Sequence, residues 1–359
     1  ECVFFDCNSL TSITIPDSLT EVGTKAFTGC FNLESFKGNN SSEDERCLII
    51  DGTLVAFAPA ELTEYSIPNG VTAIGDYVFN NCVYLKKITI PNSVTSVGNY
   101  SFYYCNNLVS VNMGNGVTKI GSSAFYSCRS LVNINIPEGV SAIGDSTFYN
   151  CYNITSLTIP NSVTIIGNCA FYYCNKVTSL TIPNSVASIG NYAFNYCNKI
   201  VTLTIGNGVT SIGNYAFYNC SSLDEVYVLA ETPPALGTSA LYSSPICYIP
   251  AGTLDAYQSS AWVSYVSGFV EQGQCGDNLY WTISDGVLSI TGSGTMYDYT
   301  AEALAPWYGQ LANITTINLP DGLTSIGAWA FYDCDSISSI SIPSTVTTIG
   351  NEALYHCSN

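Results

Sequence analysis

Cysteine is the residue type with the widest choice of chemistry in this chain, and its cysteines recur at a fixed interval. Seven of the sixteen follow one another in steps of 23 residues: Cys82, Cys105, Cys128, Cys151, Cys174, Cys197 and Cys220. A ladder of identical positions gives each thiol two equivalent neighbours and no unique disulfide partner. No two cysteines have the CxxC spacing of a zinc site. We therefore predict that the ladder cysteines are free, buried thiols, since cysteine behaves as a small hydrophobe, and we predict no metal site.

Few other groups could catalyse a reaction. His356 is the single histidine, and the sequence supplies no partner that would complete a nucleophilic triad with it. Asp and Glu are scattered, and no carboxylate pair of the kind used in glycoside hydrolysis stands out. The GNGV and TGSG segments lack the lysine and hydroxyl of a phosphate-binding loop. The sequence thus predicts a protein that is not an enzyme and uses no cofactor.

The composition narrows the range of partners. Charged residues make up only 10% of the chain, and the formal net charge is −18. Such an acidic chain repels the phosphate backbone of nucleic acids and the surface of anionic membranes. The sequence has no run of 18 apolar residues, so we predict no membrane insertion.

The cysteine interval belongs to a longer repeat. Residues 177–197 read VTSLTIPNSVASIGNYAFNYC, and residues 200–220 read IVTLTIGNGVTSIGNYAFYNC. The last three residues of each L-x-x-I-x-I segment alternate like a strand, and Pro or Gly then marks a turn. The Phe three residues before each ladder cysteine is predicted to stack into an internal spine, from Phe79 to Phe217. Because one 23-residue unit cannot bury its apolar side alone, we predict a solenoid of stacked rungs. Each rung should hold two short parallel strands and a turn or a 3₁₀ piece.

The repeat is interrupted twice. The first block, 1–228, contains an irregular insert at 38–66, where CLIIDGTLVAF predicts a hairpin around Asp51–Gly52. We interpret 229–272 as the C-terminal cap of this block, with a strand at ICYIP and a helix near Thr253–Tyr265. A hairpin around Asp285–Gly286 and a short helix over Ala305–Ile314 predict an N-terminal cap at 273–313. A second block, 314–359, follows, and because both chain ends fall inside repeats we expect a fragment of a longer protein.

The pattern L-x-x-[VI]-x-IP-x-x-V-x-x-IG-x-x-AF-x-x-C resembles the BspA-type leucine-rich repeat over about two thirds of the chain. The stretches ETPPALG, IPAGTLDAY and CGDNLYWTISDGVLSITGSGTMYDY resemble that family too. The chain departs from the pattern at the insert, at 241–244 where the cysteine is missing, and at Leu354 in place of Phe. The resemblance implies a right-handed leucine-rich-repeat solenoid that is exported to a microbial cell surface or secreted. It also implies adhesion to host matrix proteins, mucus or other cells.

Two sets of outward-facing residues are candidate binding surfaces. The strand face is predicted to contain one residue from each rung: Thr89, Asn112, Asn135, Thr158, Thr181, Thr204 and Tyr227. Solenoids commonly bind partners on an extended face, although threonine also simply favours strands. A Tyr stripe follows the spine: Tyr103, Tyr126, Tyr149, Tyr172 and Tyr218. Tyrosine is enriched at recognition surfaces, although these rings could equally shield the rung edges.

The sequence therefore predicts a non-catalytic, extracellular protein-binding or adhesion solenoid. Its expected partner is a protein or glycoprotein on the surface of a host or neighbouring cell. Two alternatives stay open. One is a structural stalk that displays another domain, and the other is a carbohydrate-binding module, which the Tyr stripe favours.

Overall fold

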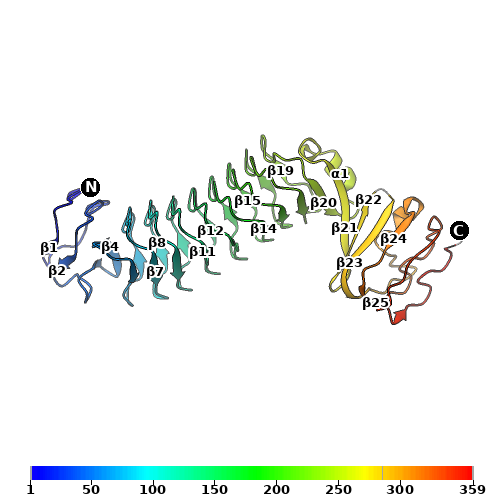
Figure 1. Ribbon diagram of the computed structural model, residues 1–359, viewed down its shortest axis with the longest axis horizontal. Helices are drawn as coiled ribbons and strands as arrows, with labels where there is room; N and C mark the ends of the chain where they lie inside the picture. Colours follow the sequence, from blue (N-terminus) through cyan, green and yellow to red (C-terminus); the bar gives the residue numbers. More distant parts are fainter. Residues whose placement is uncertain (1, 285, 358–359) are drawn as a thin grey trace. The chain divides into compact units, whose positions relative to one another are not determined.

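The structure is a computed structural model that describes residues 2–284 and 286–357 (Figure 1). Two compact units divide the chain. Unit 1 contains the residues up to Val226 together with Pro233–Pro245 and Ser264–Val266. Unit 2 contains Tyr227–Thr232, Ile246–Val263 and the residues from Ser267 onward. The residues interpreted as the first cap, 229–272, are thus divided between both units, and the border falls within strand β18 (Glu225–Val228).

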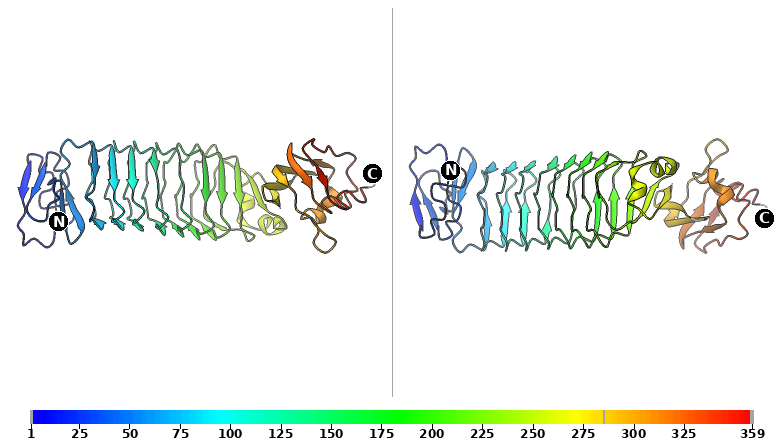
Figure 2. Two further views of the ribbon diagram at one scale, coloured as in Figure 1. Left: turned by 90° about the horizontal axis from the view of Figure 1, so that it is seen from below. Right: turned by 90° about the horizontal axis from the view of Figure 1, so that it is seen from above.

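Unit 1 is a solenoid whose regular rungs form parallel sheets on two sides, although one rung contributes only a bridge, at Ser156, to the long-strand side (Figure 2). The long-strand sheets contain β5 (Glu64–Ser66), β7 (Lys87–Ile90), β9 (Ser110–Met113), β11 (Asn133–Ile134), β14 (Ser179–Ile182) and β16 (Thr202–Ile205). The short-strand sheets contain β6 (Ala73–Ile74), β8 (Ser96–Val97), β10 (Lys119–Ile120), β12 (Ala142–Ile143), β13 (Ile165–Ile166), β15 (Ser188–Ile189), β17 (Ser211–Ile212) and β19 (Ala235–Leu236). Residues pair with their equivalents 23 positions along the chain, as Ile88 does with Val111. This confirms the predicted leucine-rich-repeat solenoid of 23-residue rungs.

The core of unit 1 follows from the alternation of its strands. In β7, Ile88 and Ile90 are buried, whereas Lys87 and Thr89 point outward. The predicted spine is confirmed, because neighbouring Phe rings lie 4.8–5.4 Å apart with interplanar angles of 1–10° from Phe79 to Phe217. Each stacked pair contributes about 0.5–1.5 kcal/mol beyond the burial of its apolar area.

All sixteen cysteines are free thiols, and the seven of the regular ladder are buried. The Cys105 thiol donates to the carbonyl oxygen of Phe79, in the preceding rung, at 3.0 Å. The next five ladder thiols repeat this bond to the preceding spine Phe at 3.0–3.4 Å. Burial raises the pKa of the Cys151 thiol to about 12, so it stays protonated and keeps its donor. The ladder position thus requires a small apolar side chain that also carries a hydrogen-bond donor.

The turn side of each rung enters the left-handed region of backbone conformation twice. In one rung these residues are Tyr100, with φ of 54°, and Tyr104, with φ of 59°. This conformation costs a non-glycine residue roughly 1–2 kcal/mol. The N–H groups of both tyrosines and of Phe102 offset that cost by donating to carbonyl oxygens of the following rung at 2.8–3.1 Å. In the regular rungs these donors point toward the following rung, so the turn ladder is polarised along the solenoid.

The insert in the first block is built into the solenoid. Strands β3 (Cys47–Ile50) and β4 (Thr53–Phe57) form the predicted antiparallel hairpin, with positive φ at both Asp51 and Gly52 as a type I′ turn requires. Strand β4 then pairs in parallel with β6 of the short-strand sheet. The Phe57 ring lies 4.7 Å from Phe79, so the insert starts both a sheet and the spine. Before it, β1 (Ser12–Thr14) pairs in parallel with β2 (Ser35–Lys37).

Unit 2 begins with strand β20 (Ile246–Pro250), at the predicted ICYIP, which pairs in parallel with β21 (Gly268–Gly276). Strands β21, β22 (Leu279–Ser284) and β23 (Val287–Thr295) form an antiparallel meander that includes the predicted hairpin, although Asp285 lies outside the described residues. Strands β24 (Thr316–Asn318) and β25 (Gly322–Ile326) both pair with β23, and β26 (Thr348–Ile349) pairs with β25.

The helices of unit 2 are shorter than predicted. The helix expected near Thr253–Tyr265 is a five-residue helix α1 (Leu254–Gln258) followed by a 3₁₀ turn, η1 (Ala261–Ser264). Residues Ala305–Ile314 contain a 3₁₀ segment, η2 (Tyr308–Asn313), in place of an α-helix. Among the described residues, the search for a helix long and apolar enough to cross a membrane found none.

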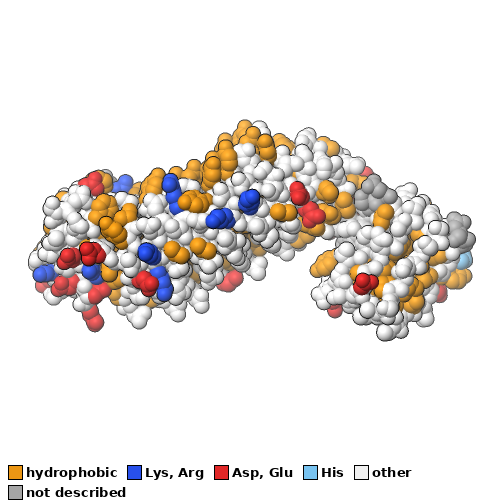
Figure 3. Space-filling view, in the orientation of Figure 1, with side chains coloured by type: hydrophobic (Ala, Val, Ile, Leu, Met, Phe, Trp, Pro, Cys, Tyr) orange, Lys and Arg blue, Asp and Glu red, His pale blue; other side chains and the backbone are white. Residues whose placement is uncertain are grey.

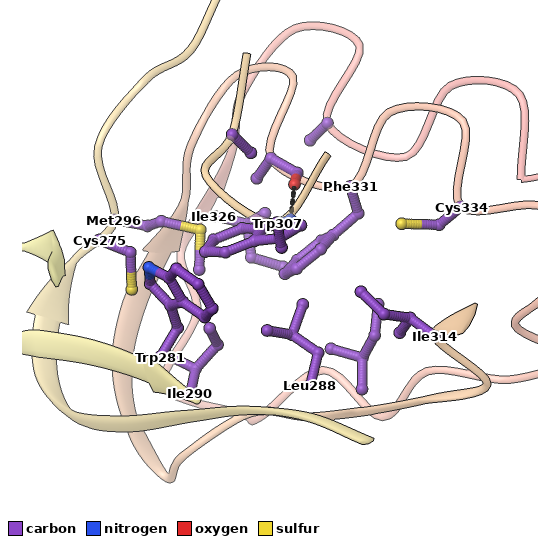
Figure 4. Close-up of a cluster of buried hydrophobic side chains, with 14 of the residues drawn as sticks. Cys275, Trp281, Leu288, Ile290, Met296, Trp307, Ile314, Ile326, Phe331 and Cys334 are labelled. Atoms are coloured by element: carbon purple, nitrogen blue, oxygen red, sulfur yellow. Dashed lines mark hydrogen bonds between the residues drawn. The ribbon is translucent and has the colours of Figure 1, made fainter. Parts of the chain in front are cut away.

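The core of unit 2 is built around two tryptophans, and Trp307 takes the place that a preceding rung would fill (Figure 4). Its ring stacks on Phe331 at 5.8 Å, as one spine Phe stacks on the next. Its indole Nε1–H donates to the carbonyl oxygen of Ala330 at 2.7 Å, where a backbone N–H would donate in the regular turn ladder. One side chain therefore supplies both the ring and the donor, which is compatible with the interpretation of residues 273–313 as an N-terminal cap.

Candidate binding surfaces

Four of the predicted strand-face residues of unit 1 are paired in register on the long-strand side, whereas Asn135 and Thr158 lie just outside the strands. Thr89 pairs with Asn112, and Thr181 pairs with Thr204. The strand face is defined here as the six residues of unit 1, which are exposed or half-buried: Thr89, Asn112, Asn135, Thr158, Thr181 and Thr204. Tyr227, the seventh predicted residue, belongs to unit 2, where its ring stacks on that of Tyr248 at 4.4 Å.

The polar groups of the strand face are not used by the fold. At the corners of the rungs, by contrast, polar side chains bond to the neighbouring rung. The Thr95 hydroxyl donates to the carbonyl oxygen of Thr72 at 3.1 Å, and Asp76 accepts the N–H of Asn99 at 2.7 Å. Within residues 2–284 and 286–357, no strand-face side chain makes a hydrogen bond to another part of the chain. These hydroxyls and amides are therefore free to exchange water for a partner.

A groove of about 680 Å³ adjoins the N-terminal part of the strand face. The side chains of Thr89 and Asn112 line it, together with the asparagines of three successive turns, Asn69, Asn92 and Asn115. Met113, Ile67 and Ile90 are also among its lining residues, and all three are buried. No charged side chain is among the lining residues, so the groove offers amides and hydroxyls over an apolar base.

The Tyr stripe also lies where the repeat predicts. Adjacent rings are 4.8, 4.4 and 4.7 Å apart in the order Tyr103, Tyr126, Tyr149 and Tyr172. Tyr218 is separated from this stack, because Asn195 takes the equivalent position between them, and it meets Tyr242 edge-on at 5.0 Å. Partial burial raises the pKa of both Tyr103 and Tyr126 to about 12, so these phenols are neutral at physiological pH.

Stacking limits what the Tyr stripe can bind. The interplanar angle is 0° between the rings of Tyr126 and Tyr149 and 2° between those of Tyr149 and Tyr172. Each inner ring thus covers the faces of its neighbours, and what it presents outward is an edge with a hydroxyl group. Flat packing of an apolar ligand surface on a tyrosine needs a free ring face. The stack does not offer one between Tyr126 and Tyr149 or between Tyr149 and Tyr172, which removes the main support for carbohydrate binding by this stripe.

A second repeated polar element, not predicted from the sequence, follows the recurring glycine of most regular rungs. The side-chain oxygen at this position accepts the backbone N–H of the equivalent residue in the next rung. Asp145 binds the N–H of Asn168, and Asn168 binds that of Asn191, at 2.7 and 2.9 Å. The recurrence of Asn or Asp after Gly was the available signal. These residues hold neighbouring rungs together and carry little charge, which is why so polar a solenoid needs few ion pairs.

Charge is distributed unevenly along the chain. Residues 65–226, the regular rungs, contain six Lys and Arg and five Asp and Glu. Residues 1–64 contain three basic and eleven acidic residues, and residues 227–359 contain eleven acidic residues and no Lys or Arg. The acidity of the protein thus belongs to its two ends. In Figure 3 the Lys and Arg side chains spread over the regular rungs, whereas the acidic ones of unit 1 gather mainly near its N-terminal rungs.

The groups considered for catalysis do not converge. His356 Nδ1 lies 3.3 Å from a carboxylate oxygen of Asp333, and the imidazole is well exposed. Burial raises the pKa of the Cys128 and Cys174 thiols, which is the opposite of what a nucleophilic cysteine needs. Among the described residues, the search for groups of His, Cys, Asp or Glu that could hold a metal found none.

Comparison with known proteins places the chain in a family. The BspA type Leucine rich repeat region, six copies, matches residues 1–45, 54–177, 141–256 and 307–359. The chain belongs to the BspA-type leucine-rich-repeat family. Proteins built from leucine-rich repeats generally bind other proteins on a solenoid surface. A comparison with curated proteins finds no match.

Three solved structures illustrate what the chain is similar to. A leucine rich cell surface protein of Faecalibacterium prausnitzii is 24% identical, with 85% of this chain and 82% of that chain covered and a TM-score of 0.47. A leucine-rich repeat protein of Bacteroides ovatus is 21% identical, with 99% and 78% covered and a TM-score of 0.49. The Pneumococcal vaccine antigen PcpA is 15% identical, with 74% and 90% covered and a TM-score of 0.35.

Proposed function

We propose that this protein is a non-catalytic adhesion solenoid that binds a protein or glycoprotein on a host or neighbouring cell through its strand face. It acts outside the cell that makes it, on the cell surface or as a secreted protein. The proposal rests on one observation, the exposed or half-buried hydroxyls and amides of the strand face that the fold itself leaves without partners. Family membership supports it, because leucine-rich repeats generally bind proteins.

The strand face suits a protein partner more than a small molecule. Its residues repeat at the strand spacing of about 4.8 Å, so the six of them span roughly 24 Å. A stable protein interface buries about 800 Å² on each partner, which a flat face of this length can contribute. The groove beside Thr89 and Asn112 adds a concave site for a side chain of the partner.

The test is binding of the purified chain to immobilised matrix proteins and mucin, measured by interferometry at physiological salt. In the variant Thr158→Tyr/Thr181→Tyr, two bulky neutral side chains cover the strand face without adding charge. The matched control is Ile165→Tyr, in the same rung as Thr158 but on the short-strand side, where Ile165 is 50% exposed.

Saturable binding that the strand-face variant loses and the control keeps would support the proposal. Binding that survives the strand-face variant would refute the assignment of the face. Absence of binding to every protein on the panel would favour the stalk that displays another domain.

A further inference from the structure

One edge of unit 1 carries cations beside exposed aromatic rings. The edge lies between each ladder cysteine and the start of the long strand that follows it. We define the basic edge by six exposed residues, in order along the solenoid: Tyr84, Lys86, Arg129, Tyr152, Lys176 and Lys199. Lys and Arg side chains are visible over the regular rungs in Figure 3, and Asp224, one rung beyond Lys199, ends the run of positive charge.

The cations of the basic edge have no acidic partners. Across the part of the chain that the structure describes, no ion pair includes any of its four cations, although the neighbouring Lys87 pairs with Glu64 at 3.7 Å. Lys176 and Lys199 occupy equivalent positions in adjacent rungs, because Ser179 and Thr202, three residues later in each, are paired. The backbone positions of these two like-charged residues therefore stand about one rung spacing, ~4.8 Å, apart. This arrangement is unfavourable for the isolated protein and favourable once an anion lies between them.

The fold does not need these lysines. In two other regular rungs the position of Lys176 and Lys199 is filled by an asparagine that bonds to the preceding rung. Asn107 Nδ2 donates to the carbonyl oxygen of Val83 at 2.6 Å, and Asn153 Nδ2 donates to that of Arg129 at 2.8 Å. Lys176 and Lys199 make no such hydrogen bond and carry a positive charge instead. The most positive part of the basic edge therefore lacks a bond that stabilises other rungs.

The two tyrosines of the basic edge differ from those of the Tyr stripe. Tyr84 is 55% exposed and Tyr152 is 37% exposed. The ring contacts among the described residues include neither of them, so neither is covered by another aromatic ring. They lie three rungs apart, or roughly 14 Å at the strand spacing. A free tyrosine face packs against the apolar face of a sugar ring, whereas the stacked rings of the Tyr stripe cannot.

From these contacts we infer that the basic edge binds an acidic polysaccharide, a linear glycan whose carboxylate or sulfate groups alternate with neutral sugars. The chain of sugars runs along the solenoid from Lys86 to Lys199, about 24 Å at the rung spacing. The cations pair with its acidic groups, and Tyr84 and Tyr152 pack against sugar faces between them. This site is separate from the strand face and does not depend on the proposed binding of a protein there.

A nucleic acid fits the same edge less well. Binding of single strands relies on stacking successive bases on aromatic rings, and the rings of Tyr84 and Tyr152 are too far apart for that. A nucleic acid also carries closely and evenly spaced negative charge, which the acidic residues at 1–64 and 227–359 repel. A glycan whose acidic groups are separated by neutral sugars needs positive charge at only a few points, which the cations of the basic edge supply.

The test uses the full chain and a size-defined chondroitin sulfate oligosaccharide, with binding measured by calorimetry or interferometry over a range of salt concentrations. The informative variant is Lys176→Asn/Lys199→Asn, which removes two charges and introduces the residue that other rungs use, so folding is preserved. The matched control is Lys37→Asn/Lys119→Asn, which removes two exposed charges elsewhere on unit 1. The same backbone without sulfate and carboxylate groups, and an oligothymidylate, serve as comparison ligands.

The expected result is saturable, salt-sensitive binding that weakens at least tenfold in Lys176→Asn/Lys199→Asn and less than threefold in the control. Tyr152→Ala should weaken it further, and the neutral backbone should not bind. Equal loss in both double variants would show a general charge effect and overturn the assignment. Oligothymidylate binding as tight as the glycan, or no glycan binding by a chain with native circular dichroism, would overturn it as well.

Discussion

Shortening Phe148 is the most direct test of how the rungs hold together. Its ring is fully buried and stacks on Phe125 at 5.4 Å and on Phe171 at 5.3 Å. Replacing a buried Phe with Ala costs about 3–5 kcal/mol of the free energy of unfolding. Loss of two ring stacks adds roughly 1–3 kcal/mol, at about 0.5–1.5 kcal/mol each. Phe148→Leu keeps most of the apolar contact and should lose mainly the stacking, since Leu241 fills the equivalent position at the end of the spine.

The place of the substitution along the solenoid should determine how the protein unfolds. Rungs of a solenoid contact only their neighbours, so stability is a sum of local terms and interfaces. Phe148→Ala should uncouple the rungs before it from those after it, and urea unfolding followed by circular dichroism should split into two transitions. Phe148→Leu should shift a single transition.

Amide hydrogen exchange gives the decisive measurement. We expect faster exchange in the rungs on either side of Phe148 and little change in rungs several steps away, with substitution of the exposed Thr158 by Ala as the control. The reasoning is wrong if exchange accelerates equally in every rung, or if Phe148→Ala is no more destabilising than Phe148→Leu.

Three further predictions concern the thiols, Trp307 and the turns. Burial raises the pKa of Cys151 from its ordinary 9.0 to about 12, so the folded state favours the neutral thiol. The neutral thiol therefore stabilises the folded state fully below pH 9, and this stabilisation is lost toward pH 12 by about 1.4 kcal/mol per pH unit. The urea concentration at the midpoint of unfolding should fall between pH 8 and pH 11, and an unchanged midpoint would contradict this. Trp307→Phe keeps an aromatic ring but leaves the carbonyl oxygen of Ala330 without its hydrogen-bond donor, which should lower the stability of unit 2 by about 1–3 kcal/mol. Amide hydrogen exchange should then accelerate in unit 2 and not in unit 1. In Gly116→Ala the new methyl group would overlap a backbone carbonyl of the preceding rung. In Gly139→Ala, at the equivalent position of the next rung, the nearest atom is a threonine methyl carbon at 3.1 Å. Thermal melting should therefore show the larger loss of stability, about 1–3 kcal/mol, for Gly116→Ala.

The repeated parts of the fold could be predicted because each rung meets a copy of itself. Once the 23-residue period is known, the pairing of Ile88 with Val111 and the stacking of Phe102 on Phe125 follow without knowledge of the rest of the chain. The caps lack that advantage. The helix expected near Thr253–Tyr265 is two short pieces, because Tyr257 and Trp262 are fully buried and tertiary packing outweighs local helix preference there.

The conformation of the turns could not be predicted from residue preference. Tyr100 and Tyr104 adopt left-handed backbone angles that usually indicate Gly or Asn. Bonds to the next rung decide this geometry, and a single rung read in isolation contains no sign of them. The strand face could be predicted from alternation alone. The availability of its polar groups could not, because that depends on which side chains the neighbouring rungs use.

The polarised turn ladder bears on how such proteins change length during evolution. In its turn, each regular rung presents backbone donors toward the following rung and acceptors toward the preceding one, so a gene duplication can extend the turn ladder only with a complete repeat in the original orientation. An insertion of any other length must leave the ladder as a loop or supply its own strand, as the hairpin of β3 and β4 does. Related proteins should therefore differ in length by whole multiples of the repeat, with remaining differences confined to the ends and to a few such hairpins.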